Sequence, residues 1–259
     1  MFFYLLPIRK KVAFSNLTLC FPEKDLHWKN KIIKECYINL GIDLFEFFYL
    51  PSFSNSVIEK NIKFENEDFI EDFVNDNKSV FIVSGHISNW ELMAYTFGRK
   101  FSTSLKIIAK KQASRKLNDK INDYRESGGN EIIQIGYSLR SVYEKLKLKN
   151  IFCFLTDQSA NPDYSVYVNF FGQNVATFSG PARIALKKRP VLIAGYGVRQ
   201  SDLSYKMYFE NIKYDDLTDY NDENVTELTQ RIQSKLESII RHNPGQWLWL
   251  HKRFKHIKN

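Results

Sequence analysis

Short apolar runs alternate with helical patterns along most of the chain, and this alternation constrains the fold more than any other feature. Runs rich in β-branched and aromatic residues, which favour strands, lie at 79–84, 105–109, 131–135, 151–155, 166–170, 191–196 and 205–210. Helical patterns lie between several of them, at 90–99, 115–127, 138–148 and 178–188. Strands that alternate with helices predict an α/β fold, with a mainly parallel central sheet flanked by helices.

Two longer helical patterns lie outside this alternating region. Residues 24–50 carry a wide apolar stripe, and their last part, 44–50, is apolar on nearly every side. The stripe predicts a helix that faces the core, while its apolar end leaves room for contact with lipid. The second pattern, 223–242, ends at the turn-forming sequence NPG. We find no internal repeat and no linker-like segment, so we expect the residues 1–259 to form a single domain.

The net charge of +8 and the pI near 9.2 favour an anionic partner. Composition alone leaves nucleic acid, an anionic membrane, a phosphorylated substrate and an acidic carrier protein open. The three cysteines, Cys20, Cys36 and Cys153, form no CxxC pair, which argues against a disulfide framework and against a structural zinc site. The sequence contains no GxGxxG and no P-loop, so we expect neither a nucleotide cofactor nor a metal.

The segment 84–91, SGHISNWE, places His86 and Glu91 between a predicted strand and a predicted helix. In α/β proteins this is where reactive side chains are usually exposed. A histidine with a carboxylate partner can remove a proton from a hydroxyl, while the carboxylate orients the ring. We therefore predict that His86 is a general base oriented by Glu91. The alternative is a pair of surface charges or of satisfied core groups.

Two further segments hold candidate site residues. Asp157 and Gln158 follow directly after the run 151–155, so they are expected at the same edge of the sheet as His86; the alternative is that they form a turn. Arg125 lies near the end of a predicted helix. It compensates the helix dipole in one interpretation and binds a phosphate group in the other.

The C-terminal segment 246–255, QWLWLHKRFK, interleaves aromatic and basic side chains. Such a segment is expected either to stack on nucleic-acid bases or to lie at a membrane interface. The basic residues of 106–120 and 187–189 are interpreted as solvated surface.

Several of these segments together resemble the bacterial lipid A biosynthesis acyltransferases, the lauroyl/myristoyl transferase group. Each piece is weak alone, but their order along nearly the whole chain is specific. The matching pieces are Leu6-Pro7-Ile8-Arg9, Asn16-Leu17, Phe21-Pro22-Glu23, Ser84-Gly85-His86 with Asn89-Trp90-Glu91, Arg125 ahead of Gly128, Asp157-Gln158, Phe170-Phe171-Gly172 with Gly180-Pro181-Ala182, and the segment 246–254.

The resemblance implies a fold related to the glycerolipid acyltransferases, and a reaction without a cofactor. It implies an acyl-acyl-carrier-protein donor, a phosphorylated glycolipid acceptor and an anionic membrane surface at the cytoplasmic face of the cell inner membrane. His86 and Glu91 match the catalytic pair of the HX4(D/E) motif. Arg125 and Asp157 are the best matches to two further functional positions, which we interpret as substrate-binding.

The N-terminal segment 1–50 is expected to be membrane-proximal and helical. Members of this family typically carry a membrane-spanning helix ahead of the Leu-Pro-x-Arg-like segment, whereas only Met1–Leu6 precede Pro7 here. We expect either that such a helix is missing from this chain or that Phe2, Phe3 and the aromatic helix bind the membrane surface. Lys110-Lys111-Gln112 and Gly245 also depart from the family pattern, which leaves the acceptor open.

Three alternative functions follow from the same residues. The first is the same chemistry on a different lipid acceptor. The second is a thioesterase, in which His86 activates water instead of an acceptor hydroxyl. The third is a non-catalytic nucleic-acid binder built on the segment 246–255. A nucleic-acid partner is not expected if the resemblance holds.

Overall fold

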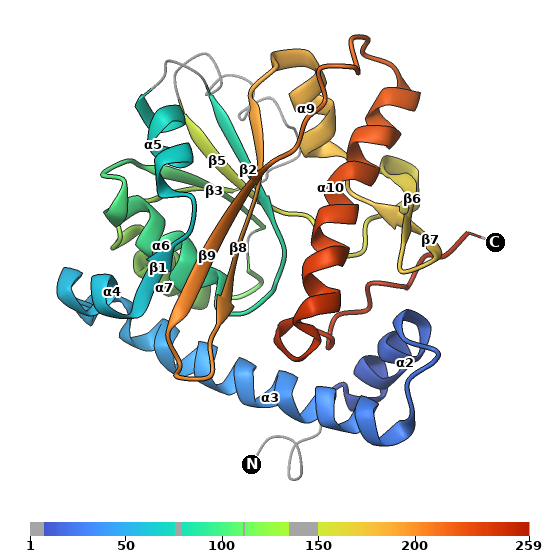
Figure 1. Ribbon diagram of the computed structural model, residues 1–259, viewed down its shortest axis with the longest axis horizontal. Helices are drawn as coiled ribbons and strands as arrows, with labels where there is room; N and C mark the ends of the chain where they lie inside the picture. The colour runs from blue at the N-terminus through green and yellow to red at the C-terminus, as the bar shows by residue number, and fades with distance from the viewer. Residues whose placement is uncertain (1–7, 76–78, 111, 135–149, 259) are drawn as a thin grey trace.

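The structure is a computed structural model, and it describes residues 8–75, 79–110, 112–134 and 150–258 (Figure 1). Its helices are α2 (Lys10–Cys20), α3 (Leu26–Tyr49), α4 (Asn55–Asn61), α5 (Glu67–Asn75), α6 (Trp90–Lys100), α7 (Arg115–Glu126), α9 (Gly180–Lys188) and α10 (Asp222–His242). Its strands are β1 (Ile62–Phe64), β2 (Val80–Ser84), β3 (Leu105–Ala109), β4 (Glu131–Gln134), β5 (Ile151–Leu155), β6 (Val166–Phe170), β7 (Gln173–Thr177), β8 (Val191–Arg199) and β9 (Tyr205–Asn211).

The central sheet has the strand order β1-β9-β8-β2-β5-β3-β4 within the described residues. In this sheet the β8–β9 pair is antiparallel, and all the other described pairs of neighbouring strands are parallel. β2 lies at the centre between β8 and β5, and its residue Ser84 pairs with Leu155 of β5. The carboxyl ends of β2 and β5, which carry the candidate site residues, are therefore adjacent.

Helices cover both faces of the sheet (Figure 1). Along β2 the side chains alternate between the two faces, as the pleat of a strand requires. Phe81 and Val83 belong to the core cluster shared with α9 and α10. Val80 and Ile82 belong to the cluster shared with α6. Because both faces are buried, β2 is apolar along nearly its whole length rather than amphipathic.

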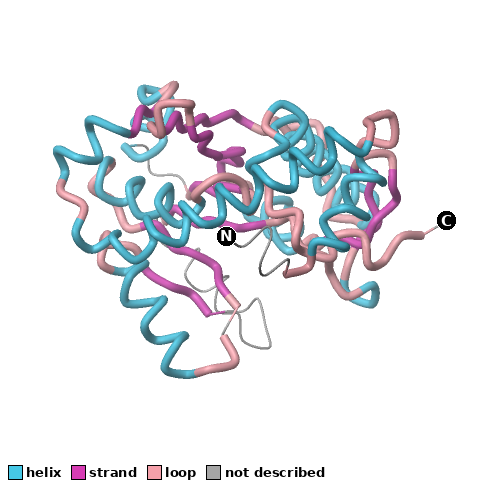
Figure 2. The backbone as a smooth tube through the Cα atoms, turned by 90° about the horizontal axis from the view of Figure 1, so that it is seen from below, coloured by secondary structure: helices cyan, strands magenta, loops and turns pink. Residues whose placement is uncertain are grey.

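A third core cluster joins the N-terminal helices to the C-terminal segment. Ile33 and Cys36 of α3 pack in it with Trp247 and Trp249, which are at most 1% exposed. α3 is the longest helix drawn, and it runs beneath the sheet from the α2 side to the α4 side (Figures 1 and 2). Asp25 caps its first turn by accepting the backbone N–H of Trp28 at 2.7 Å.

The fold class predicted from the sequence is confirmed. The predicted strands agree with β2, β3, β4, β5, β8 and β9 to within a few residues. The run 166–170 was expected beside them, but it pairs only with Gln173–Thr177 in a separate antiparallel hairpin. Phe171 and Gly172 both have positive φ there, which is the geometry of a tight hairpin turn. The predicted helix 138–148 lies outside the described residues.

The structure also contains elements that the sequence pattern did not indicate. These are β1, β7, and the helices α4 and α5, whereas α2 and α3 lie in the segment 1–50 that was expected to be helical. Among the described residues, none of the helices is both long and apolar enough to cross a membrane. The predicted apolar stripe of α3 is buried at Ile32, Ile33, Cys36 and Tyr37, but toward the end of the helix Phe45 is 70% exposed.

Candidate active site

The loop between β2 and α6 holds His86 in a tightly defined position. It follows Gly85, where a Cβ atom would lie only 3.1 Å from Asp157 Oδ2 and 2.7 Å from Leu236 Cδ1. A side chain at Gly85 would therefore push the Asp157 carboxylate away. The loop then passes through Ser88, which is fully buried and has a φ of 51°. It ends at Asn89, whose Oδ1 caps α6 by accepting the Leu92 N–H.

Asp157 is the carboxylate that contacts the His86 ring. Its Oδ1 lies 2.7 Å from His86 Nδ1, and its Oδ2 accepts the backbone N–H of His86 at 2.7 Å. The indole N–H of Trp247 donates to the same Oδ2 at 2.8 Å. Asp157 is 3% exposed, so three donors compensate the loss of its hydration. The pair fixes the ring orientation and directs Nε2 away from Asp157.

The electrostatics of the pair suit a base. Burial of the His86 ring opposes its protonation, but the charge and the hydrogen bond of Asp157 outweigh burial and raise the pKa of His86. Burial also opposes ionisation of Asp157, yet His86 and the donated hydrogen bonds hold the pKa of this carboxyl well below its ordinary value. With Asp157 ionised and Nδ1–H donating to it, the neutral ring carries its lone pair on Nε2. Gln158 Nε2 lies 3.3 Å from that atom.

Glu91 pairs with Arg125 rather than with His86. Arg125 donates from Nε to Oε2 at 2.8 Å and from Nη2 to Oε1 at 2.5 Å, and Trp90 Nε1 donates to Oε1 at 3.1 Å. The prediction that Glu91 orients the His86 ring is therefore wrong. Glu91 lies in the first turn of α6 and faces Arg125 of α7, whereas His86 lies on the preceding loop and faces β5. The spacing of these residues in the sequence did not show that Glu91 pairs with Arg125 while Asp157 contacts His86.

His86, Glu91 and Arg125 line one cleft with a volume of about 770 Å³. Trp90 also lines this cleft, with its ring centroid 4.8 Å from that of His86. The remaining lining residues are mixed: apolar side chains come from β3 and β5, and polar ones from the segment after β5. They are Ala94, Ile107, Ile108, Ala109, Lys110, Gln112, Cys153, Phe154, Leu155, Thr156, Gln158, Ser159, Ala160, Asn161, Tyr164 and Phe178. The cleft can hold an apolar chain beside a polar reacting group.

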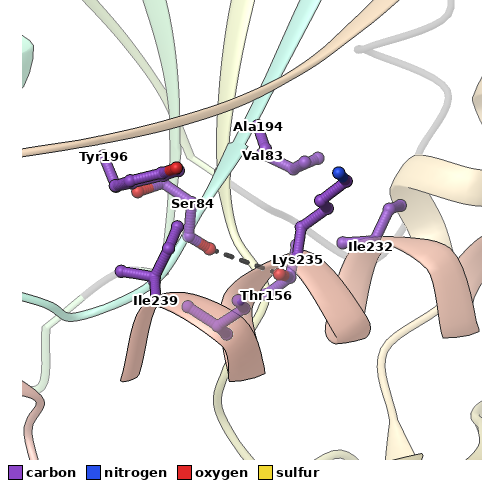
Figure 3. A pocket seen from close by; sticks show the side chains of 10 residues that line it. Val83, Ser84, Thr156, Ala194, Tyr196, Ile232, Lys235 and Ile239 are labelled. Atoms are coloured by element: carbon purple, nitrogen blue, oxygen red, sulfur yellow. Dashed lines mark hydrogen bonds between the residues drawn. The ribbon is translucent and has the colours of Figure 1, made fainter. Parts of the chain in front are cut away.

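Hydrogen bonds hold the ends of β2 and β5 together. Thr156 N donates to Ser84 O at 2.9 Å. Its Oγ1 donates to the same atom at 3.2 Å (Figure 3). Gln233 of α10 donates to Thr156 O at 3.0 Å. Figure 3 shows Ser84 and Thr156 in the small cavity beside α10, where Lys235 and Ile239 also lie. The backbone that carries His86 and Asp157 is thus anchored from behind the cleft.

The C-terminal segment contributes to the site from inside the protein. Trp247 and Trp249 are at most 1% exposed, and Arg253 is 0% exposed. The backbone of this segment also pairs with the loop between β2 and α6, because Leu248 N donates to His86 O at 3.0 Å. The prediction that 246–255 forms an aromatic-basic surface for nucleic acid or membrane is therefore wrong for these side chains. Sequence reasoning did not place Trp247 at the site, since 90 residues separate it from Asp157.

Cys153 lines the cleft but is unsuited to act as a nucleophile. Burial raises its pKa to about 12, which keeps it a thiol. In the described ranges, no group of three or more His, Cys, Asp or Glu side chains is arranged to hold a metal ion. The His86–Asp157 pair offers hydrogen-bonded acid–base chemistry.

The chain is similar to known proteins along nearly its whole length. A family described as "Bacterial lipid A biosynthesis acyltransferase" matches residues 1–256. The lipid A biosynthesis palmitoleoyltransferase of Escherichia coli (strain K12) is 26% identical over 253 residues, which cover 95% of this chain and 79% of that protein. The lipid A biosynthesis lauroyltransferase of the same organism is 23% identical over 250 residues, with the same coverage of both chains. A lipid A biosynthesis acyltransferase of Shigella flexneri is 26% identical over 253 residues. The chain belongs to the bacterial lipid A biosynthesis acyltransferase family.

Proposed function

We propose that the protein transfers a fatty acyl group from acyl-acyl-carrier protein to a hydroxyl of a lipid A precursor, with His86 as the general base. The observation that carries this proposal is the His86–Asp157 pair beside a cleft that both apolar and polar side chains line. Membership of the family supports acyl transfer. Action at the cytoplasmic face of the inner membrane is part of the same proposal.

The transfer is direct and passes through a ternary complex. His86 Nε2 removes the proton from the acceptor hydroxyl, and the hydroxyl oxygen attacks the thioester carbonyl carbon. The tetrahedral intermediate collapses, the carbon–sulfur bond breaks, and the imidazolium returns the proton to the departing thiolate. Asp157 stabilises the imidazolium between these steps. We assign Asp157 to His86 rather than to the substrate, because it is almost completely buried.

Arg125 and Glu91 are proposed to serve the reacting carbonyl and the acceptor. Arg125 uses Nε and Nη2 on Glu91 and, within the described part of the chain, no hydrogen bond occupies its Nη1. Glu91 raises the pKa of Arg125 against the effect of burial, so the guanidinium stays charged in the cleft. A fixed cation there stabilises a developing oxyanion or a phosphate of the acceptor. The catalytic role predicted for Glu91 is in this way exerted through Arg125.

The charge of the protein suits both substrates. Lys110 lines the cleft, and Arg115, Lys116 and Lys120 are exposed on the neighbouring α7. An acidic carrier protein or a phosphorylated glycolipid is attracted to such a rim, because opposite charges accelerate and orient encounter.

The proposal is tested by mass spectrometry of lipid recovered after incubation with acyl-acyl-carrier protein and a tetra-acylated lipid A precursor. We expect the precursor to gain one acyl chain. Arg125→Ala in the same assay should slow this gain, because the cleft loses its fixed cation. Consumption of the donor without an acylated lipid would instead identify a thioesterase. Acylation of another lipid, offered in parallel, would identify a different acceptor.

The end of α3 is proposed to bind the membrane surface. Four neighbouring side chains form what we call the α3 apolar surface: Leu44, Phe45, Phe48 and Tyr49, with exposed fractions of 48%, 70%, 57% and 60%. Their spacing along the helix places them on one side of its last two turns. Exposed aromatic side chains grouped in this way favour an interfacial position, and the positive net charge adds attraction to anionic lipid.

Replacing Phe45 and Phe48 with serine should weaken binding to phosphatidylglycerol-containing vesicles by at least about tenfold, because two aromatic side chains lose burial in the lipid interface. Vesicle co-sedimentation measures this. Tyr220→Ser is the control, because Tyr220 is 45% exposed and belongs to the loop before α10. Added salt should weaken binding further, since it screens the charge contribution. Equal binding by the wild-type protein and the double variant at every salt concentration would refute this surface.

A further inference from the structure

Glu46 of α3 reaches the loop between β2 and α6. Its Oε2 accepts hydrogen bonds from Asn89 Nδ2 at 2.8 Å, from the Tyr205 hydroxyl at 2.5 Å and from Arg199 Nη2 at 3.1 Å. Asn89 is 1% exposed, and its Oδ1 accepts the N–H of Leu92. Both ends of the Asn89 amide are therefore held, one by α6 and one by α3.

The loop transmits the position of Asn89 to His86. The two residues lie only three apart, and between them Ser88 holds a left-handed φ of 51° while fully buried. Ser88 N donates to Gln246 O at 2.7 Å, and Leu248 N donates to His86 O at 3.0 Å. A loop bonded at each end and packed in between moves as a unit, so a shift of Asn89 moves the histidine as well.

We propose that Glu46 is a positioning residue for His86: by holding Asn89, it keeps the His86 ring in contact with Asp157. The chemistry assigned to His86 rests on the proposed function, but the positioning itself rests on these contacts alone. Glu46 acts from α3, the helix that also carries the α3 apolar surface. Glu46, on the polar side of the last turns of α3, thus holds the loop between β2 and α6 through its hydrogen bond with Asn89.

Asp43 provides a matched control. It lies three residues before Glu46 on α3 and forms an ion pair with the same guanidinium, that of Arg199. Within the described residues Asp43 makes no contact with Asn89. Asp43→Ala and Glu46→Ala therefore each remove one carboxylate from Arg199, while Glu46→Ala also removes the acceptor of the Asn89 side chain and of the Tyr205 hydroxyl. If Glu46 served only the cluster with Arg199 and Tyr205, neither substitution would alter the alignment of the His86 ring.

The first measurement is an NMR titration of His86, identified among the five histidines by its loss in His86→Ala. The charged and titratable groups that act on this ring are Asp157, Glu91, Arg125 and His251. We expect Glu46→Ala to lower the pKa of His86, because the ring loses its alignment with Asp157. Asp43→Ala should leave that pKa near the wild-type value. Glu46→Gln should restore it in part, since an amide oxygen can still accept from Asn89.

The second measurement is steady-state acyl transfer by the folded fraction of each variant. Glu46→Ala should lower kcat on the order of 10–100-fold, as expected for a displaced catalytic group, with KM for the donor changed by less than about threefold. Asp43→Ala should retain kcat. Equal titration curves and equal kcat values for Glu46→Ala and Asp43→Ala would overturn the proposal. If the wild-type protein transfers no acyl group, the proposed function fails, while the titration still decides whether Glu46 positions His86.

Discussion

Replacing His86 with alanine should lower the rate of acyl transfer by a factor of at least about 10²–10⁴, which corresponds to about 3–5 kcal/mol of transition-state stabilisation. Neither Glu91 nor Cys153, which also line the cleft, can take its place. Glu91 is engaged by Arg125 and Trp90, and the thiol of Cys153 stays protonated because burial raises its pKa. The measurement is the initial rate of acylated lipid formation, followed by mass spectrometry.

The control for this substitution is His242→Ala. His242 lies at the end of α10, and its Nδ1 is hydrogen-bonded to Ser238 O of its own helix. It should retain the wild-type rate. The fold of His86→Ala should also be retained, since the loop keeps its backbone hydrogen bonds to Gln246 and Leu248. Undiminished acylation by correctly folded His86→Ala would remove His86 from the mechanism.

Replacing Asp157 with asparagine should lower kcat by a factor on the order of 10²–10⁴, because the substitution removes the charge that stabilises the imidazolium and fixes its tautomer. It should also move the pH profile. A general base is active when neutral, so activity falls as the pH drops through the pKa of His86. Asp157 raises this pKa in the wild-type protein. In Asp157→Asn the acid limb should therefore move to lower pH, while the maximum rate falls.

Glu91→Gln, measured in the same pH profile, distinguishes the role of Glu91 from that of Asp157. If Asp157 orients the ring, Glu91→Gln should move the acid limb less than Asp157→Asn does, because Glu91 acts on His86 only through space. If Glu91 were the orienting carboxylate, as the sequence spacing indicated, the larger movement would belong to Glu91→Gln. The kcat/KM profile of free enzyme measures this pKa directly.

Part of the site was predictable from local sequence. His86 and Asp157 each follow a strongly apolar run, and parallel neighbouring strands bring their carboxyl ends together. Strand character and the parallel arrangement depend on composition and order over a few residues, which one sequence displays. Arg125 was also placed correctly, in the last turn of a helix, because α7 shows clear helical periodicity.

The partners of these residues were not predictable in the same way. Glu91 is five residues from His86, yet its bond is to Arg125, while the orienting carboxylate lies 71 residues from the histidine. Trp247 completes the carboxylate's hydrogen bonds from a segment that looked like an exposed tail. Distances between side chains on different elements depend on how helices and loops pack. The separation of two residues in the sequence does not predict that packing.

Local propensity and hydrophobic periodicity were enough to predict the alternating elements, the mainly parallel sheet, and the sheet edge at which His86 lies. The packing of the fold sets which carboxylate contacts the His86 ring and which one pairs with Arg125. It also decided that Trp247 and Arg253 lie inside the protein, and that Glu46 supports the loop from α3. A buried polar group forms hydrogen bonds with the groups that lie within about 3 Å of it, and the packing of the elements determines which groups those are.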